Sequence, residues 1–358
     1  MKINKISAIG LILVTMTFQI GCAASTDSAQ ETTEVTEQTE TAEAVETQSE
    51  EYEAEEADTL EDVVVKVGAM TGPTAMTLVE LMEKSEARKT DVDYEFADLA
   101  TEASALVSPL VSGELDIACV PSNLATVIYN NNDAAVEVLA TCNTGVLYVV
   151  ERGESVKSIT DLAGKTVYMT GQGAIPEYVV RYLLSQNGID PDSDLTLQFC
   201  ADTTEALSYI SADDSAIAIL PQPFVTAACM QVEDLEVAID LNDEWNKLGN
   251  GCDIITGVVV ASKAFVEENP SVTEQFLKDY KESVEYTSQD VEGTASLIEK
   301  YGIVKKAAIA QKALPSCNLV AKTGSDLKKS LSGFLEVLYE QNPASIGNAM
   351  PADDFYYE

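Results

Sequence analysis

Two short motifs recur in the same order in the two halves of this sequence. Met70-Thr71-Gly72 and Met169-Thr170-Gly171 each follow a strand-like run and precede a helix-like stretch. Pro121-Ser122-Asn123 and Pro221-Gln222-Pro223 each follow a second apolar run. The interval from Thr71 to Pro121 is 50 residues, and that from Thr170 to Pro221 is 51 residues. Motifs that repeat in order at matched spacing predict two lobes of similar fold.

Strand-like and helix-like runs alternate through the folded part of the chain, which predicts an α/β architecture. Leu147–Arg152 is predicted to cross into the second lobe, and Ile254–Ala261 is predicted to return. The mostly helical pattern after the return strand is predicted to pack on the first lobe. The predicted domains are 62–150 plus 255–345 for lobe 1, 151–254 for lobe 2, and 346–358 for a loose C-terminal tail.

Residues 1–21 are typical of an export signal. Two lysines stand near the start, Ile6–Ile20 is mostly apolar, and Gly21 is a small residue before Cys22. The apolar run is too short for a membrane span. The pattern resembles a bacterial lipoprotein signal, in which the cysteine after the cleavage point is acylated, although Gln19 stands where an aliphatic residue is usual. We expect lipidation of Cys22; the alternative is an ordinary cleaved signal followed by an incidental cysteine.

Residues 22–61 are predicted to form an acidic, disordered tether. Residues 23–62 hold 15 Asp and Glu and no Lys or Arg, with a glutamate at every third position from Glu31 to Glu46. This composition cannot build a packed core, and its like charges extend the chain. A flexible coil of about 40 residues spans roughly 35 Å. The segment therefore suits a spacer that lifts a folded domain off a membrane, with acyl chains as the attachment.

Charge and residue types exclude several functions. The chain has 60 Asp and Glu against 21 Lys and Arg, a net charge of −39, which disfavours nucleic acid as a partner. It has no histidine, which excludes Ser-His-Asp and Cys-His catalysis and imidazole metal ligands. The six cysteines after Cys22 form no CxxC pair, and whether they form disulfides stays open. No catalytic residue, metal or cofactor is predicted.

The repeated loops are the predicted binding site. Ligands of open α/β sheets lie beyond the carboxyl ends of the strands, where loops lead into helices. Glycine allows close backbone approach, and free N–H groups at helix starts favour an anionic or carbonyl group. Trp245 is included because its ring, flanked by polar residues, could stack on a flat solute. The candidates are Thr71, Gly72, Pro73, Thr74, Pro121, Ser122, Asn123, Thr170, Gly171, Gln172, Gly173, Ala174, Gln222, Pro223 and Trp245.

Each kind of candidate also has a purely structural interpretation. Thr74 and Ser122 suit ordinary helix N-caps. Pro73 and Pro223 suit the first turns of helices, whether or not the loops bind anything. Most aromatic residues belong to the core. Other aromatic residues near loops or crossings are Phe96, Tyr148, Tyr168 and Phe224.

The order of these features resembles the substrate-binding proteins of ABC importers, in the nitrate, taurine, sulfonate and thiamine-precursor branch. The second lobe of such proteins typically opens with SxxDLxGK, which begins SITDLAGKTVYMTGQGAIPEYVVRYLL (Ser158–Leu184) in this chain. The helical stretch Glu268–Tyr280 after the return strand is also typical. The resemblance covers about residues 62–340. It implies a bilobed type II periplasmic-binding-protein fold, with two doubly wound lobes joined by two crossing strands and a solute held between them.

The resemblance implies a small organic solute, an ABC permease in the membrane as partner, and no catalysis. It also implies an extracytoplasmic, lipid-anchored monomer. None of the three arginines lies in a candidate loop, so no bidentate clamp for a sulfonate or carboxylate is visible, and a neutral or zwitterionic solute fits as well. Two other functions stay open: a surface receptor or sensor lipoprotein, and an enzyme of this fold that works without histidine.

Overall fold

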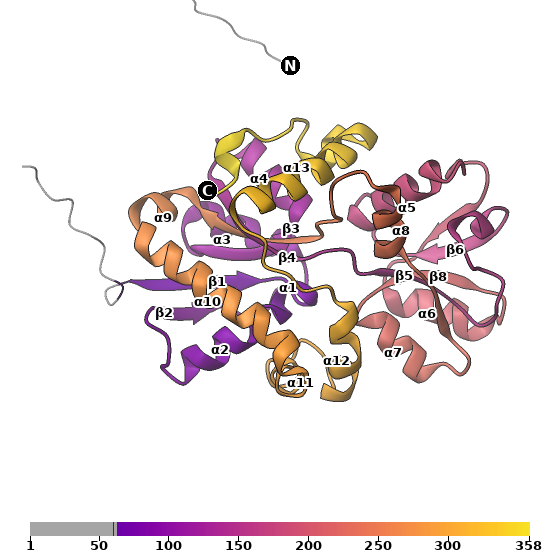
Figure 1. Ribbon diagram of the computed structural model, residues 1–358, viewed down its shortest axis with the longest axis horizontal. Helices are drawn as coiled ribbons and strands as arrows, with labels where there is room; N and C mark the ends of the chain where they lie inside the picture. The colour runs from indigo at the N-terminus through magenta and orange to yellow at the C-terminus, as the bar shows by residue number, and fades with distance from the viewer. Residues whose placement is uncertain (1–59, 61–62) are drawn as a thin grey trace, which may run out of the picture. The chain divides into compact units, whose positions relative to one another are not determined.

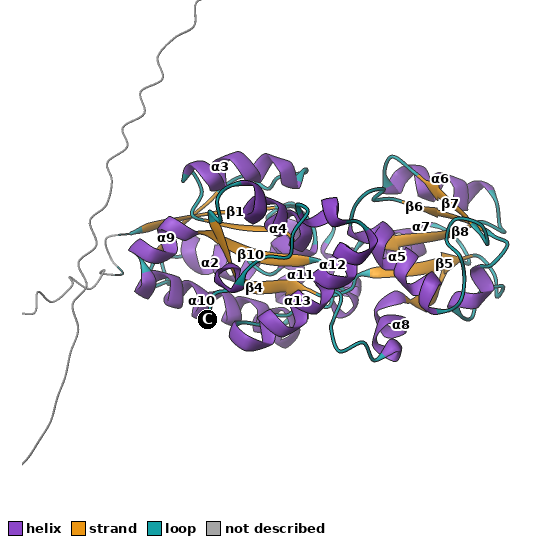
Figure 2. Cartoon of the chain, turned by 90° about the horizontal axis from the view of Figure 1, so that it is seen from above, coloured by secondary structure: helices purple, strands orange, loops and turns teal. Residues whose placement is uncertain are grey.

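The computed structural model describes residue 60 and residues 63–358. The predicted signal peptide, the predicted lipidation of Cys22 and the predicted tether, apart from Leu60, lie outside the described residues. Among the helices of the described part, none is both long enough and apolar enough to cross a membrane. The described chain builds two five-stranded sheets with helices around them (Figures 1 and 2).

The first sheet has the strand order β2-β1-β3-β10-β4. In it, β1 (Val64–Ala69) lies between β2 (Asp93–Phe96) and β3 (Ile117–Pro121), and these three strands are parallel. The fourth strand, β10 (Gly257–Ser262), runs antiparallel to β3 and to β4 (Val136–Asn143). The sheet is therefore mixed, with a parallel part that carries the first repeat.

The second sheet has the strand order β7-β6-β8-β5-β9. Here β6 (Thr166–Met169) lies between β7 (Thr196–Phe199) and β8 (Ile217–Pro221), again in parallel. β5 (Leu147–Glu151) runs antiparallel to β8 and to β9 (Glu236–Asp240). Each position in this sheet has a counterpart in the first.

The equivalence of the two sheets extends to their register. Val67 on β1 pairs with Ile117 on β3, and Val167 on β6 pairs with Ile217 on β8. The chain passes from the first sheet to the second after β4 and enters the second sheet at β5. It returns after β9 and α8 and enters the first sheet at β10. Both β5 and β10 run antiparallel to their neighbours. The predicted fold class, α/β with two lobes joined by two crossings, is confirmed.

Helices cover the faces of both sheets (Figures 1 and 2). They range from α1, with four residues, to α10, with 20. Prolines at the first turns of α1, α5 and α10 suit helix starts because the missing N–H would be unpaired there. The helices are α1 (Pro73–Met76), α2 (Val79–Glu86), α3 (Val107–Ser112), α4 (Ser122–Asn131), α5 (Ile175–Gln186), α6 (Thr203–Ala212), α7 (Phe224–Gln231), α8 (Leu241–Leu248), α9 (Lys263–Glu268), α10 (Pro270–Gln289), α11 (Val291–Lys300), α12 (Ala307–Ala313) and α13 (Gly324–Gln341).

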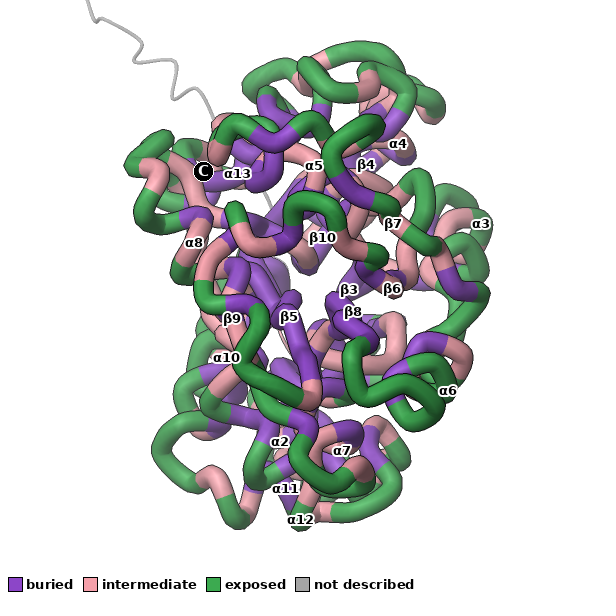
Figure 3. Tube along the Cα trace, turned by 90° about the vertical axis from the view of Figure 1, so that its right-hand side faces the viewer, coloured by how far each residue is buried: buried purple, intermediate pink, exposed green. Residues whose placement is uncertain are grey.

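The central strands are buried on both faces (Figure 3). Successive side chains of a strand point to opposite faces, so β3 sends Cys119 into the core layer that contains Phe276 and sends Val120 into the layer that contains Phe334. The latter layer continues into the second lobe and includes Val149 of β5. One hydrophobic cluster thus spans both lobes.

Hydrogen bonds tie the two crossings together. The Thr256 hydroxyl on the returning chain donates to the carbonyl oxygen of Thr144 on the outgoing chain at 2.9 Å. Asp253 on the returning chain pairs with Lys322 and accepts from the Ser330 hydroxyl at 2.8 Å. Burial alone would raise the pKa of Asp253, but Lys322 and Ser330 outweigh burial and hold this pKa below its usual value.

The lobe boundaries expected from the sequence stay a prediction.

The prediction of a loose tail over 346–358 is wrong. Phe355 is fully buried, and its ring meets that of Tyr129 at a centroid distance of 5.0 Å in an edge-to-face arrangement. The backbone N–H of Tyr357 donates to the carbonyl oxygen of Val138 on β4 at 3.1 Å. Asp354 pairs with Lys263 at 2.8 Å. The segment packs because its aromatic side chains fill the space beside β4 and α4.

Candidate functional site

The loop after β1 takes its shape from Gly72, which has φ 113° and ψ −154°. This backbone region is open almost only to glycine. Pro73 begins α1, and the Thr74 hydroxyl donates to the carbonyl oxygen of Met70 at 2.6 Å. Thr74 is therefore not the N-cap that its place suggested, since Gly72 holds that position. Thr71 is half-buried, and nothing among the described residues bonds its hydroxyl.

In the loop after β3, the side chains of Ser122 and Asn123 donate hydrogen bonds to other parts of the chain. Pro121 holds the N-cap position of α4, so Ser122 is the first helical residue and not the expected cap. Ser122 is fully buried, and its hydroxyl donates to the carbonyl oxygen of Ile255 at 2.5 Å. Asn123 donates through Nδ2 to the carbonyl oxygen of Ser345 at 3.3 Å. Ser122 thus ties α4 to the return crossing, and its hydroxyl is occupied.

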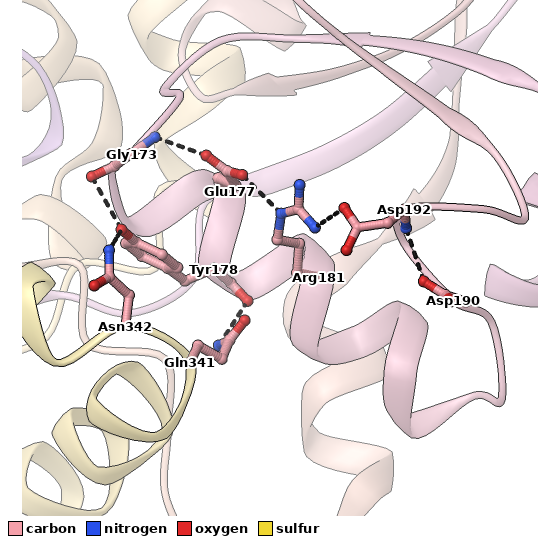
Figure 4. Close-up of polar contacts among 8 residues, drawn as sticks. All are labelled: Gly173, Glu177, Tyr178, Arg181, Asp190, Asp192, Gln341 and Asn342. Atoms are coloured by element: carbon pink, nitrogen blue, oxygen red, sulfur yellow. Dashed lines mark hydrogen bonds and ion pairs between the residues drawn. The ribbon is translucent and has the colours of Figure 1, made fainter.

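The loop after β6, residues Thr170–Ala174, leads into α5 and is called the β6 loop below. Gly171 and Gly173 have φ values of 85° and 72°. Glu177 Oε2 accepts from the Gly173 N–H at 2.7 Å, so the first turn of α5 holds the loop (Figure 4). Gln172 is exposed, and within the described part neither its amide nor the Thr170 hydroxyl has a hydrogen-bond partner.

The loop after β8 leads into α7, which begins at Phe224. Gln222 is buried, and its Oε1 accepts from the Thr226 hydroxyl at 2.9 Å. Pro223 holds the N-cap position of α7 rather than its first turn. Phe224, which follows, is 51% exposed although it is a large apolar residue. The candidate set omitted Phe224, and the signal that favours it is its place directly after Gln222-Pro223.

The prediction that Trp245 lies at the site is wrong. Trp245 is fully buried, and its Nε1 donates to the carbonyl oxygen of Cys252 at 2.9 Å. Its ring packs against Tyr182 at 4.8 Å and Phe334 at 5.7 Å between centroids. Its polar sequence neighbours occupy the other side of α8, because helical spacing puts Trp245 on the same face as Leu241. The pattern that would have revealed this is the i, i+4 pair Leu241 and Trp245.

Adjacent parallel strands bring the other candidates together in pairs of loops. The loops after β1 and β3 meet at one edge of the first sheet, because the two strands are neighbours with the same direction. The loops after β6 and β8 meet in the same way at the second sheet. Ligands of α/β sheets bind at such edges.

The four loops carry no cationic side chain. The nearest arginine in sequence, Arg181 on α5, bonds Glu177 at 2.7 Å and Asp192 at 2.8 Å (Figure 4). Burial alone would lower the pKa of Arg181, but the hydrogen bonds to Asp192 and Glu177 outweigh it, and the pKa lies above its usual value. The guanidinium is therefore already neutralised by two carboxylates.

Reactive groups near the loops are few. Cys200 follows β7, and burial together with Glu205 and Asp202 raises the pKa of its thiol, which disfavours a thiolate nucleophile. The six cysteines of the described residues are free thiols. In the same part of the chain, no group of three or more Cys, Asp or Glu side chains is placed to hold a metal ion.

A cavity of about 560 Å³ lies against the β6 loop. Gln172 and Gly173 line it from the loop, Tyr178 lines it from α5, and Gln341 and Asn342 line it from the end of α13. The structure thus places two predicted site residues beside a segment of the other lobe that sequence reasoning did not connect with them.

Gly171→Ala is expected to destabilise the protein more than Gly173→Ala. Both positions have positive φ, which costs a non-glycine residue about 1–2 kcal/mol. A Cβ on Gly171 would also lie 2.8 Å from Pro176 Cγ, whereas one on Gly173 meets nothing within 4 Å. Chemical denaturation of the two variants measures the difference. Equal losses of stability would contradict the steric role of Pro176.

Comparisons with known proteins agree with this architecture. A family described as NMT1/THI5 like matches residues 88–292, more than half of the 358 residues. An ABC transporter structure from Parabacteroides distasonis is 21% identical, with a TM-score of 0.69 over 83% of this chain and 99% of that chain. The aliphatic sulphonate binding protein SsuA from Escherichia coli is 14% identical, with a TM-score of 0.65 over 82% of this chain and 92% of that chain.

A third structure extends the similarity beyond bacteria. A Candida albicans gene product described as having the generic periplasmic binding protein structural fold is 14% identical, with a TM-score of 0.52 over 82% of this chain and 93% of that chain. At such identities the structures establish the fold alone. No curated protein matches the sequence.

Proposed function

The chain belongs to the NMT1/THI5-like family, and on this premise we propose that it is the extracytoplasmic solute-binding component of an ABC importer. The observation that carries the proposal is the equivalence of the two sheets. Each presents a glycine-bearing loop and a second loop at neighbouring carboxyl ends of parallel strands. Two such edges in one chain suit a solute held between two lobes.

The proposed solute is a small organic molecule that is uncharged or zwitterionic. Within the four loops, the side-chain groups without a hydrogen-bond partner among the described residues include the Thr71 and Thr170 hydroxyls and the Gln172 amide. Gln222 Nε2 and Asn123 Oδ1 are also without such a partner, since only the other end of each amide is engaged. Free N–H groups at the helix starts add donors that suit a carbonyl group. The exposed ring of Phe224 offers an apolar face for stacking. A sulfonate would find no cationic side chain in these loops. The proposed solute class therefore differs from the aliphatic sulphonates in the name of the Escherichia coli neighbour.

The proposed role needs no catalysis; it needs a solute that binds the closed arrangement of the lobes more tightly than the open one. A solute that binds better to the closed arrangement of the lobes shifts the population toward it. An ABC permease would then take the solute from the closed protein. The predicted export signal and Cys22 would place the chain outside the cytoplasm and anchor it to the membrane by lipid. We propose that it acts there as a monomer. The absence of histidine supports a binding role over catalysis.

Thermal unfolding of the purified chain against a metabolite panel tests this function. The panel contains uncharged and zwitterionic nitrogenous compounds and a matched set of sulfonates. A solute at 100 times its Kd adds about 2.7 kcal/mol to stability, which raises the midpoint by several degrees. We expect such a shift with members of the first set only.

Two exposed residues at opposite ends of α7 provide the matched variants. Phe224→Ala should reduce the shift because it removes the stacking face, whereas Met230→Ala, at a residue that is 47% exposed, should leave it unchanged. Shifts confined to the sulfonates would overturn the proposed solute class. A panel without any shift would favour a receptor that contacts another protein.

A further inference from the structure

One helix, α5, contacts both the β6 loop and the end of the first lobe. Tyr178 lies in its first turn and is 6% exposed. We propose that Tyr178 is a positioning residue for the β6 loop, and that Asn342 of the other lobe holds the Tyr178 hydroxyl in place. The β6 loop is then ordered when the end of α13 contacts α5. The inference rests on the proposed function, because it takes the β6 loop as part of the solute site.

On the side of the loop, both backbone polar groups of Gly173 are held by α5. The N–H donates to Glu177 Oε2 at 2.7 Å, and the carbonyl oxygen accepts from the Tyr178 hydroxyl at 3.4 Å. Glu177 is itself fixed by Arg181 at 2.7 Å. Gly173 has positive φ, and a Cβ built on it would meet nothing within 4 Å, so no side chain packs against that side of the residue. The two hydrogen bonds to α5 are its polar contacts among the described residues.

On the side of the first lobe, the last residue of α13, Gln341, and the residue after it, Asn342, both reach the same tyrosine (Figure 4). Asn342 Nδ2 donates to the Tyr178 hydroxyl oxygen at 2.8 Å. Gln341 Nε2 donates to the Tyr178 backbone oxygen at 3.1 Å. Asn342 is oriented by its own Oδ1, which accepts from the Ala344 N–H at 3.1 Å. The Asn342 side-chain amide, which contacts Tyr178 of the other lobe, is therefore oriented by the backbone of its own segment.

The hydroxyl of Tyr178 makes this arrangement directional. A phenol has one hydrogen to donate, and because its oxygen accepts from Asn342, that hydrogen is free for Gly173. Hydrogen bonds in such a chain polarise and strengthen one another. Separation of α13 from α5 removes the Asn342 donor and weakens the bond to Gly173. By linkage, a solute that orders Gly173 would favour the joined lobes to the same extent.

Hydrogen exchange over residues 170–178 of the purified chain tests the inference without any solute. The variants are Tyr178→Phe, which removes only the hydroxyl, and Asn342→Ser, which keeps a capping oxygen but is too short to reach α5. Each should speed exchange of the Gly173 and Ala174 amides by about two- to tenfold, the equivalent of one lost hydrogen bond. The double variant should exchange no faster than either single variant, because both break one chain.

Asn130→Ala is the matched control in the first lobe. Asn130 Nδ2 donates to the carbonyl oxygens of Ile346 and Ala349, both at 2.7 Å, and so ties the same C-terminal segment without touching α5. It should leave exchange over 170–178 unchanged. Wild-type exchange in Asn342→Ser, or additive effects in the double variant, would overturn the inference. A chain that couples as expected but binds no member of the solute panel would overturn the proposed function alone.

Discussion

Trp245→Ala is expected to lower the free energy of unfolding by about 3–5 kcal/mol. The side chain is fully buried between Tyr182 and Phe334, and its removal leaves a cavity and an unpaired carbonyl oxygen on Cys252. The loss combines the transfer free energy of the indole with the cavity it leaves. Guanidinium denaturation followed by circular dichroism measures it.

The control for this change is Phe224→Ala, which removes another large ring from a position that is 51% exposed. It should change stability by about 0.5 kcal/mol or less. The pair therefore compares a ring in the core with a ring at the surface. A Trp245→Ala variant with wild-type stability and no solute binding would contradict the assignment of Trp245 to the core.

Phe355→Ala is expected to cost about 3–5 kcal/mol as well, although it lies three residues before the end of the sequence. Its ring is fully buried against Tyr129 and Tyr356, at centroid distances of 5.0 Å and 5.1 Å. Loss of the ring should also free the backbone bond from Tyr357 to Val138. The midpoint of urea denaturation reports the change.

Glu358→Gln is the matched control in the same segment. Glu358 pairs with Lys328 at 2.8 Å, but its side chain is 61% exposed, and exposed ion pairs contribute little. It should shift stability by about 0.5 kcal/mol or less. If Phe355→Ala were as mild as this control, the C-terminal segment would be the loose end that the sequence suggested.

The two-lobed fold could be predicted from the sequence because its evidence is local and repeated. A strand that ends in Met-Thr-Gly before a helix is a recognisable unit. It occurs twice, and each copy is followed by a Pro-containing loop at nearly the same distance, 50 residues from Thr71 to Pro121 and 51 from Thr170 to Pro221. The pairing of Val67 with Ile117 and of Val167 with Ile217 is the structural counterpart of that spacing. The placement of the four loops at the ends of parallel strands follows from the same units.

The roles of single side chains could not be predicted in the same way. Ser122 and Thr74 look available in the sequence, but each hydroxyl is engaged by a carbonyl oxygen, that of Ile255 and that of Met70. The partner of Ser122 is 133 residues away. The contact between Asn342 and Tyr178 joins residues 164 positions apart. No period or motif in a single sequence reports such pairs.

The burial of Phe355 was missed for a different reason. Near the end of the chain, three aromatic residues, Phe355, Tyr356 and Tyr357, stand together between acidic residues, and this run is too short to show a period. Their burial depends on the space that β4 and α4 leave between them, which only the packed fold defines. Trp245, by contrast, carried a readable signal in its spacing from Leu241.

We propose that one solute is held by loops of both lobes. Hydrogen exchange of the purified chain, with and without the compound that raises its thermal midpoint most, tests this claim directly. We predict slower exchange in segments 70–74 and 121–123 of the first lobe together with 170–174 and 221–226 of the second. Protection confined to one lobe, or located away from all four loops, would contradict the claim.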